Sequence, residues 1–155
     1  MVKLSDNIVV LSVILYLGLL APLTIFHELG HAVVCSADGF SYVIYFDNRG
    51  GHTLCHNVVH NPFLSNIMGP AFGLIASCGI LATFRFAIRN YALLAVGLAY
   101  VVDQGMKLFL EGFVPSLYNF RLDMPILLVQ LASWTAFALY YQRKRHLELA
   151  QLSTD

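Results

Sequence analysis

The stretch IVVLSVILYLGLLAPLTIF at residues 8–26 decides the fold class of this chain. It contains no charged residue and runs directly into His-Glu-Leu-Gly-His at residues 27–31. Because the hydrocarbon core of a bilayer is about 30 Å thick, a helix needs roughly 20 apolar residues to cross it. The stretch therefore predicts a membrane-spanning helix. A secretory signal peptide is less favoured, because Lys3 is offset by Asp6 and no Ala-x-Ala cleavage site follows.

Three further apolar stretches follow, at residues 62–84, 91–102 and 124–142. The one that begins at Tyr91 reaches spanning length only if charged side chains lie within the membrane. The chain is 58% hydrophobic and 12% charged, whereas soluble domains carry about a quarter charged residues. We expect an all-α membrane protein with one integral-membrane domain over residues 1–155 and about four transmembrane helices, near 8–35, 62–86, 90–112 and 123–143. The formal net charge is zero, so no nucleic-acid partner is expected.

Residues 36–61 form the one substantial polar segment. A run of aromatic and β-branched residues from Tyr42 to Phe46 is followed by the turn-like Asp47-Asn48-Arg49-Gly50, which predicts a short β-hairpin or a loop. Histidines recur at every fourth position of this segment, at His52, His56 and His60. The glycines and asparagines around them favour a polar loop over a second metal-binding stripe.

The three cysteines are odd in number and scattered along the chain, at Cys35, Cys55 and Cys78. Cys78 lies inside an apolar stretch. No disulfide framework follows from this spacing, so we expect free thiols.

The chemistry is carried by His27-Glu28-Leu29-Gly30-His31, which fits the pattern H-E-x-x-H. On a helix, His27 and His31 lie one turn apart on one face and can bind one Zn²⁺ together. Glu28 is placed to act as the general base beside them. Ionisable side chains at the end of an apolar span are costly and point to function. The motif therefore predicts a zinc site within the membrane.

A catalytic zinc usually has three protein ligands. The downstream side chains that could supply the third are Asp103, Glu111, Asp123 and the histidines at 52, 56 and 60. Counting along upright helices places Asp103 at about the same depth as His27, so Asp103 ranks first. An ion pair of Asp103 with Lys107 is the alternative interpretation. Asp123 is the reserve ligand, although Asp123 before Pro125 is also typical of a helix start.

These motifs resemble the site-2 protease family of intramembrane zinc metalloproteases. The resemblance rests on HELGH at the end of an apolar helix, Asn66-Ile67-Met68-Gly69-Pro70 in the next helix and Asp103-Gln104-Gly105 in the one after. Members carry a Gly-Pro element with a nearby Asn, and a Leu-Asp-Gly element that supplies the third zinc ligand. The chain departs from the family where Gln104 follows Asp103, and it lacks the Asn-x-x-Pro-x-Pro run before that aspartate.

The resemblance implies a zinc-dependent intramembrane endopeptidase with one Zn²⁺, held by His27, His31 and Asp103, and with Glu28 as the catalytic base. Its partners would be a transmembrane protein substrate and the lipid bilayer. The missing family run favours an alternative, a proteolytically inactive zinc-binding membrane scaffold or adaptor. Small residues repeat at every fourth position of the second apolar stretch, at Gly69, Gly73 and Ser77. They predict close helix packing within the chain, ahead of homo-oligomer formation.

We expect a multi-pass integral membrane protein of the cell membrane. Basic residues cluster at one side of the predicted bundle, at Lys3, Arg85, Arg89 and residues 143–145. The positive-inside rule makes that side cytoplasmic, whereas the resemblance places the zinc, on the opposite half, nearer the cytoplasm. The two arguments disagree, so the sequence assigns no orientation.

Overall fold

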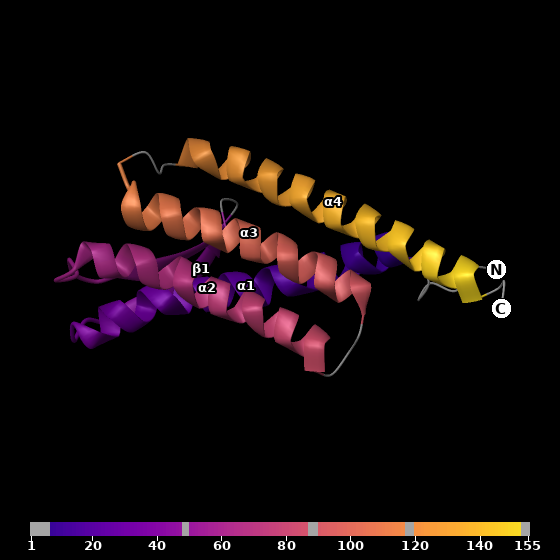
Figure 1. Cartoon of the computed structure of the whole chain (residues 1–155). Helices are drawn as coiled ribbons and strands as arrows, with labels where there is room; N and C mark the ends of the chain where they lie inside the picture. The colour runs from indigo at the N-terminus through magenta and orange to yellow at the C-terminus, as the bar shows by residue number, and fades with distance from the viewer. Residues whose placement is uncertain (1–6, 48–49, 87–89, 117–119, 153–155) are drawn as a thin grey trace.

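The computed structural model describes residues 7–47, 50–86, 90–116 and 120–152. This part of the chain forms a bundle of four long helices, with a two-stranded antiparallel hairpin after the first (Figure 1). The helices are α1 (Ile8–Ala37), α2 (Pro62–Phe86), α3 (Tyr91–Phe113) and α4 (Phe120–Leu152), and the strands are β1 (Tyr42–Asp47) and β2 (Gly50–Cys55). All four helices are long and apolar enough to cross a membrane, which confirms the predicted fold class.

Asparagine side chains begin two of the helices. The side chain of Asn7 accepts a hydrogen bond of 3.1 Å from the backbone N–H three residues later, and Asn90 accepts one of 2.9 Å from the N–H two residues later. Each bond satisfies a backbone donor that has no partner within the helix. Helix α1 ends at Ala37 with Asp38 as its C-cap, and Gly39 then turns the chain with a φ of +79°, a conformation that favours glycine.

The bundle is held by the contacts of α2 with α1 and α3, and of α4 with α3 and α1. Its core cluster consists of Tyr16, Leu23, Val96 and Tyr100. The Tyr100 hydroxyl donates to the carbonyl of Tyr16 at 3.0 Å, and the Trp134 indole N–H donates to the Ser12 hydroxyl at 3.1 Å. Large apolar side chains are exposed on the outside of the bundle, as expected for helices in contact with lipid, for example Leu17, Ile75 and Leu128.

The predicted hairpin is confirmed, and its position matters for the site. Its register pairs Tyr42 with Cys55 and Asp47 with Gly50. The hairpin packs back against α1, and the Thr53 hydroxyl of β2 donates to the backbone oxygen of Glu28 at 2.9 Å. It therefore covers the part of α1 that carries the HELGH motif.

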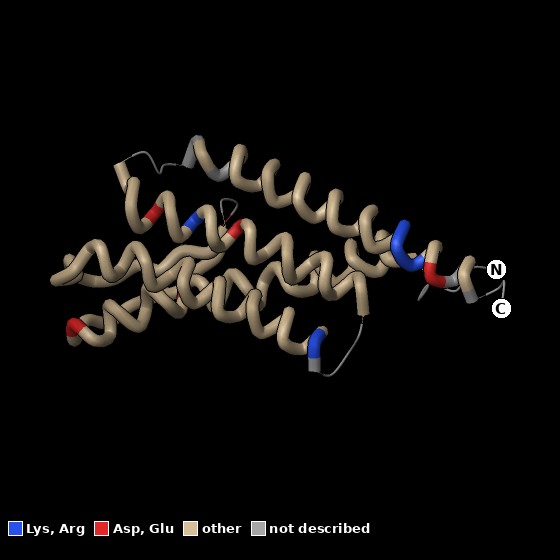
Figure 2. Tube along the Cα trace, in the orientation of Figure 1, with Lys and Arg blue, Asp and Glu red and all other residues tan. Residues whose placement is uncertain are grey.

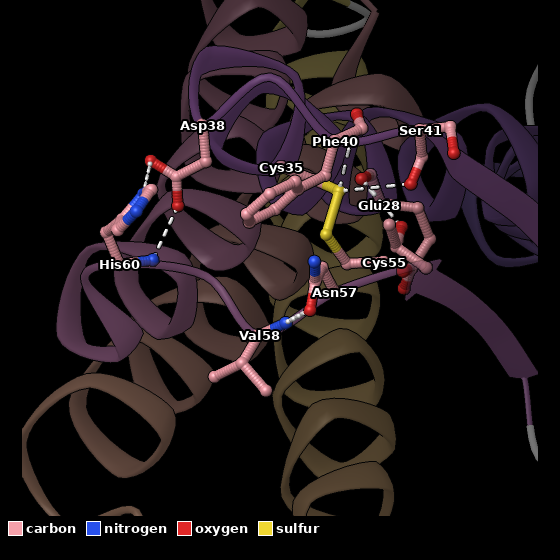
Figure 3. The surroundings of a disulfide bond; sticks show 10 residues. Glu28, Cys35, Asp38, Phe40, Ser41, Cys55, Asn57, Val58 and His60 are labelled. Atoms are coloured by element: carbon pink, nitrogen blue, oxygen red, sulfur yellow. Dashed lines mark hydrogen bonds and ion pairs between the residues drawn. A yellow bond between two sulfur atoms is a disulfide. The ribbon is translucent and has the colours of Figure 1, made fainter.

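The expectation of free thiols is wrong for two of the three cysteines. Cys35, in the last turn of α1, forms a disulfide with Cys55, the final residue of β2 (Figure 3). The bridge forms because the hairpin folds back on α1, which brings the two Cα atoms to 5.9 Å although the residues are 20 positions apart. Only Cys78 is free, and it is exposed.

The last helix is longer at both ends than the predicted range of 123–143. It begins at Phe120 and continues to Leu152, past the basic cluster at residues 143–145. Pro125 consequently lies beyond the first turn, and Asp123 does not begin the helix. The basic residues at 143–145 end the apolar stretch, but α4 continues through them because Lys and Arg are good helix formers.

Candidate metal centre

Three potential metal ligands meet where α1 and α3 face each other. The Nε2 atoms of His27 and His31 lie 3.3 Å apart, and the Glu111 Oε2 lies 3.8 Å from the first and 3.9 Å from the second. These three residues are the one group of metal-ligating side chains found among the described residues whose ligand atoms all lie within 4.8 Å of one another. The i, i+4 spacing places both imidazoles on one face of α1, as the motif predicts.

The other ring nitrogen of each histidine is held by the protein. His31 Nδ1 lies 2.7 Å from the backbone carbonyl of Ser65, which can only accept, so Nδ1 carries the proton. His27 Nδ1 lies 3.0 Å from the Gln104 Oε1. The Gln104 Nε2 donates to the Asp103 carboxylate at 2.7 Å, which fixes the orientation of the amide. His27 Nδ1 therefore also carries its proton, and it donates to Gln104.

It follows that each Nε2 presents a lone pair toward the other. Two such nitrogens at 3.3 Å repel each other unless a cation lies between them. Two imidazoles bound to a tetrahedral zinc at about 2.0–2.1 Å have their nitrogens about 3.3 Å apart. The separation observed for His27 and His31 fits this value, and the carboxylate of Glu111 would need to approach by only about half an ångström. The three side chains thus fit a zinc ion with one coordination position open.

Asp103, which ranked first as the third ligand, is not part of this group. Its carboxylate lies 3.4 Å from the Lys107 ammonium, one turn along α3, and accepts the hydrogen bond from Gln104. It is 3% exposed, so this pairing is what makes a buried carboxylate tolerable. The side chain of Asp123, the reserve ligand, lies outside the described residues.

Glu111, and not Asp103, lies beside the two Nε2 atoms, because it is about two turns further along α3. The first residues of α1 and α3, Ile8 and Tyr91, both contact residues 141–142 of α4, so the two helices start at a similar level. Along its helix, His27 then lies about 28 Å from that level, Glu111 about 30 Å and the aspartate only about 18 Å. The sequence argument ranked Asp103 first because it counted down from the end of a helix of bilayer length, whereas α1 is 30 residues long.

The predicted base, Glu28, belongs to the same cavity as the three ligands. This cavity has a volume of about 710 Å³ and is bounded by α1, β2, α3 and α4. Glu28 is 5% exposed. The hydroxyl of Thr53 in β2 lies 2.8 Å from the Glu28 Oε2 and 2.9 Å from its backbone oxygen, and can donate to either. The hairpin therefore restrains a carboxylate that lines the same cavity as the two histidines.

Two glycines of α2 give the site its space. A Cβ atom on Gly69 would collide with the imidazole of His31, and one on Gly73 would collide with the amide of Gln104. The predicted close packing by small residues at every fourth position is therefore confirmed, and it is packing within the chain. In this protein the small residues accommodate polar side chains of the site as well as the neighbouring helices.

No protein-family model, curated protein or solved structure matches the chain. The resemblance to site-2 proteases accordingly rests on the motifs themselves. The geometry of the ligand group stands independently of that resemblance, because it follows from distances and hydrogen bonds within this chain.

Several residues of the site escaped the sequence argument. Glu111 was among the downstream carboxylates but was not ranked. Gln104 was noted only as a departure from the family pattern, and Ser65 and Thr53 were not singled out. A signal for Gln104 was present, because an amide next to a buried aspartate needs a partner of its own. Ser65 contacts His31 through its backbone carbonyl, and Thr53 reaches Glu28 only because the hairpin folds back on α1. The sequence pattern indicates neither contact.

Proposed function

We propose that this protein is a zinc-dependent intramembrane endopeptidase. The observation that carries the proposal is the pair of Nε2 atoms 3.3 Å apart, with Glu111 closing the group and Glu28 in the same cavity. Three protein ligands and one open position are typical of catalytic zinc, whereas structural sites have four. The depth of the group within the bundle favours a substrate in or beside the membrane.

In this proposal His27, His31 and Glu111 hold the ion. Zinc supplies Lewis acidity and lowers the pKa of a water molecule toward 7. Glu28 takes a proton from the attacking water and delivers it to the nitrogen of the departing amine. The hydroxyl of Thr53 restrains the Glu28 carboxylate, so the base is oriented before substrate arrives.

Substrate has to reach the site in an extended form, since the carbonyls of a helix are engaged in its own hydrogen bonds. The hairpin offers a strand edge for this purpose. The backbone N–H of His56 donates to the carbonyl of Ser41, so the hydrogen-bonded pairs of the ladder continue with Val43 and Tyr45. The backbone groups of Ile44 consequently point to the free edge of β1, where an extended peptide could pair.

The decisive experiment combines metal analysis with one conservative substitution. Purified Glu28→Gln protein should retain zinc at the wild-type stoichiometry and lose proteolysis of a membrane substrate, whereas His27→Ala should lose both. Wild-type protein without zinc would refute the proposal. Glu28→Gln protein with normal proteolysis would refute the role of the base. An inactive zinc-binding scaffold predicts instead that Glu28→Gln preserves the cellular role that His27→Ala abolishes.

A further inference from the structure

The two ends of the bundle differ in charge. Both termini lie at one end, together with the start of α3 (Figure 1). Among the Lys and Arg residues whose side chains the structure describes, Arg85, Arg143, Lys144 and Arg145 lie at this end, whereas Lys107 lies within α3 (Figure 2). In the sequence, Lys3 precedes α1 and Arg89 precedes α3, whereas Arg49 stands between the two strands and Arg121 in the first turn of α4. By the positive-inside rule, the end with the termini is cytoplasmic.

The disulfide gives the same answer by an independent route. Cys35 and Cys55 are bridged at the opposite end, where α1 stops and the hairpin begins (Figure 3). Disulfides persist in oxidising compartments, whereas the cytosol keeps thiols reduced. The end of the bundle that carries the hairpin therefore faces an oxidising compartment.

The three potential metal ligands lie nearer to this hairpin end than to the opposite end. Glu111 lies in the last turn of α3, and Ser65, which holds His31, lies in the first turn of α2. The cavity is bounded by β2 on this side. A peptide outside the cytoplasm would reach the site over a short distance, while one from the cytoplasm would have to cross most of the bundle.

We infer that the site works from the extracytoplasmic side, on the part of a membrane protein that lies at or just inside that surface. This inference rests on the proposed function for its substrate and on charge and disulfide for its orientation. It is opposite to the placement that the family resemblance implies. It also gives the bridge a role, because Cys55 follows Thr53 by two residues and ties to α1 the strand that restrains Glu28.

The orientation can be tested by labelling in intact cells. In a Cys78→Ser background with the disulfide retained, Ser116→Cys places a reporter in the turn after α3, and the matched Arg145→Cys places one near the end of α4. A membrane-impermeant maleimide should label Ser116→Cys in intact cells and label Arg145→Cys only after permeabilisation. Labelling of Arg145→Cys in intact cells would overturn the inference. So would a Ser116→Cys reporter that reacts only after permeabilisation.

A thiol count tests the second observation on the unaltered chain. After rapid alkylation in denaturant, one thiol per chain should react without reduction, and three should react after reduction. Three reactive thiols without reduction would overturn the inference. Neither measurement uses zinc or proteolysis, so the orientation can fail while the zinc and Glu28→Gln results stand, and the reverse is equally distinguishable.

Discussion

Gln104 offers the sharpest test of the proposed metal centre, because it would act on zinc through His27. Substitution by leucine preserves the approximate volume and removes the acceptor that holds the His27 Nδ1 proton. In the metal-free protein His27 can respond by moving the proton to Nε2, whereas zinc binding at Nε2 requires it at Nδ1. The bound state then carries a buried N–H without a partner, which costs about 1–3 kcal/mol. We expect Gln104→Leu to raise the Kd for zinc by roughly 5- to 150-fold, in line with the 10–100-fold losses usual for such partners of metal-bound histidines.

The assay is a competition titration with a chromophoric zinc chelator on detergent-solubilised protein, with circular dichroism to establish that the bundle is intact. Gln130→Leu is the matched control, because Gln130 is also a buried glutamine that lines the same cavity. It should leave the zinc affinity within about twofold of wild type, a difference of about 0.4 kcal/mol. If Gln104→Leu and Gln130→Leu weakened zinc equally, or if neither did, the assignment of the His27 proton would be refuted.

Three further predictions address the third ligand, the strand edge and the surface near the hairpin. Glu111→Ala should abolish stoichiometric zinc, whereas Asp103→Ala should retain a more weakly bound ion; elemental analysis giving the opposite pattern would reinstate Asp103. Ile44→Pro removes a backbone donor from the free edge of β1 but none from the hairpin ladder, so it should lower cleavage several-fold with zinc retained; unchanged cleavage would dismiss pairing at this edge. The backbone N–H of His60 donates to the Asp38 carboxylate at 2.6 Å and lowers its pKa. Asp38 therefore stabilises the fold above its unfolded pKa of about 3.9, and this contribution disappears as the pH falls through the lower folded value. Acid-unfolding curves of wild type and Asp38→Asn should differ above that range and converge below it.

The architecture could be predicted because the local amino-acid composition is sufficient to identify membrane-spanning helices. The charge-free stretch before His27 and the three that follow need nothing from the tertiary structure to be identified. The hairpin was also predictable, because a run of aromatic and β-branched residues precedes turn-forming ones. The end of α4 could not be predicted in this way. Charged residues end an apolar stretch, but α4 continues past them to Leu152.

The candidate site was predictable only to the extent that its residues are local. His27, Glu28 and His31 lie within one helical turn and a half, so their relation depends on helix geometry alone. The third ligand depends on the offset between α1 and α3, which is set by contacts of both helices with α4. The disulfide depends on the hairpin folding back along α1, and sequence separation carries no information about that.

The glycines of α2 have a consequence for any attempt to engineer this protein. Replacing a helical glycine by alanine ordinarily increases helix stability by up to about 1 kcal/mol. At Gly69 and Gly73 the new methyl group would take the volume that the His31 ring and the Gln104 amide occupy. On this face of the helix, a more rigid backbone conflicts with the shape of the cavity that the His31 and Gln104 side chains line, so a gain in thermal stability has to be sought elsewhere in the chain.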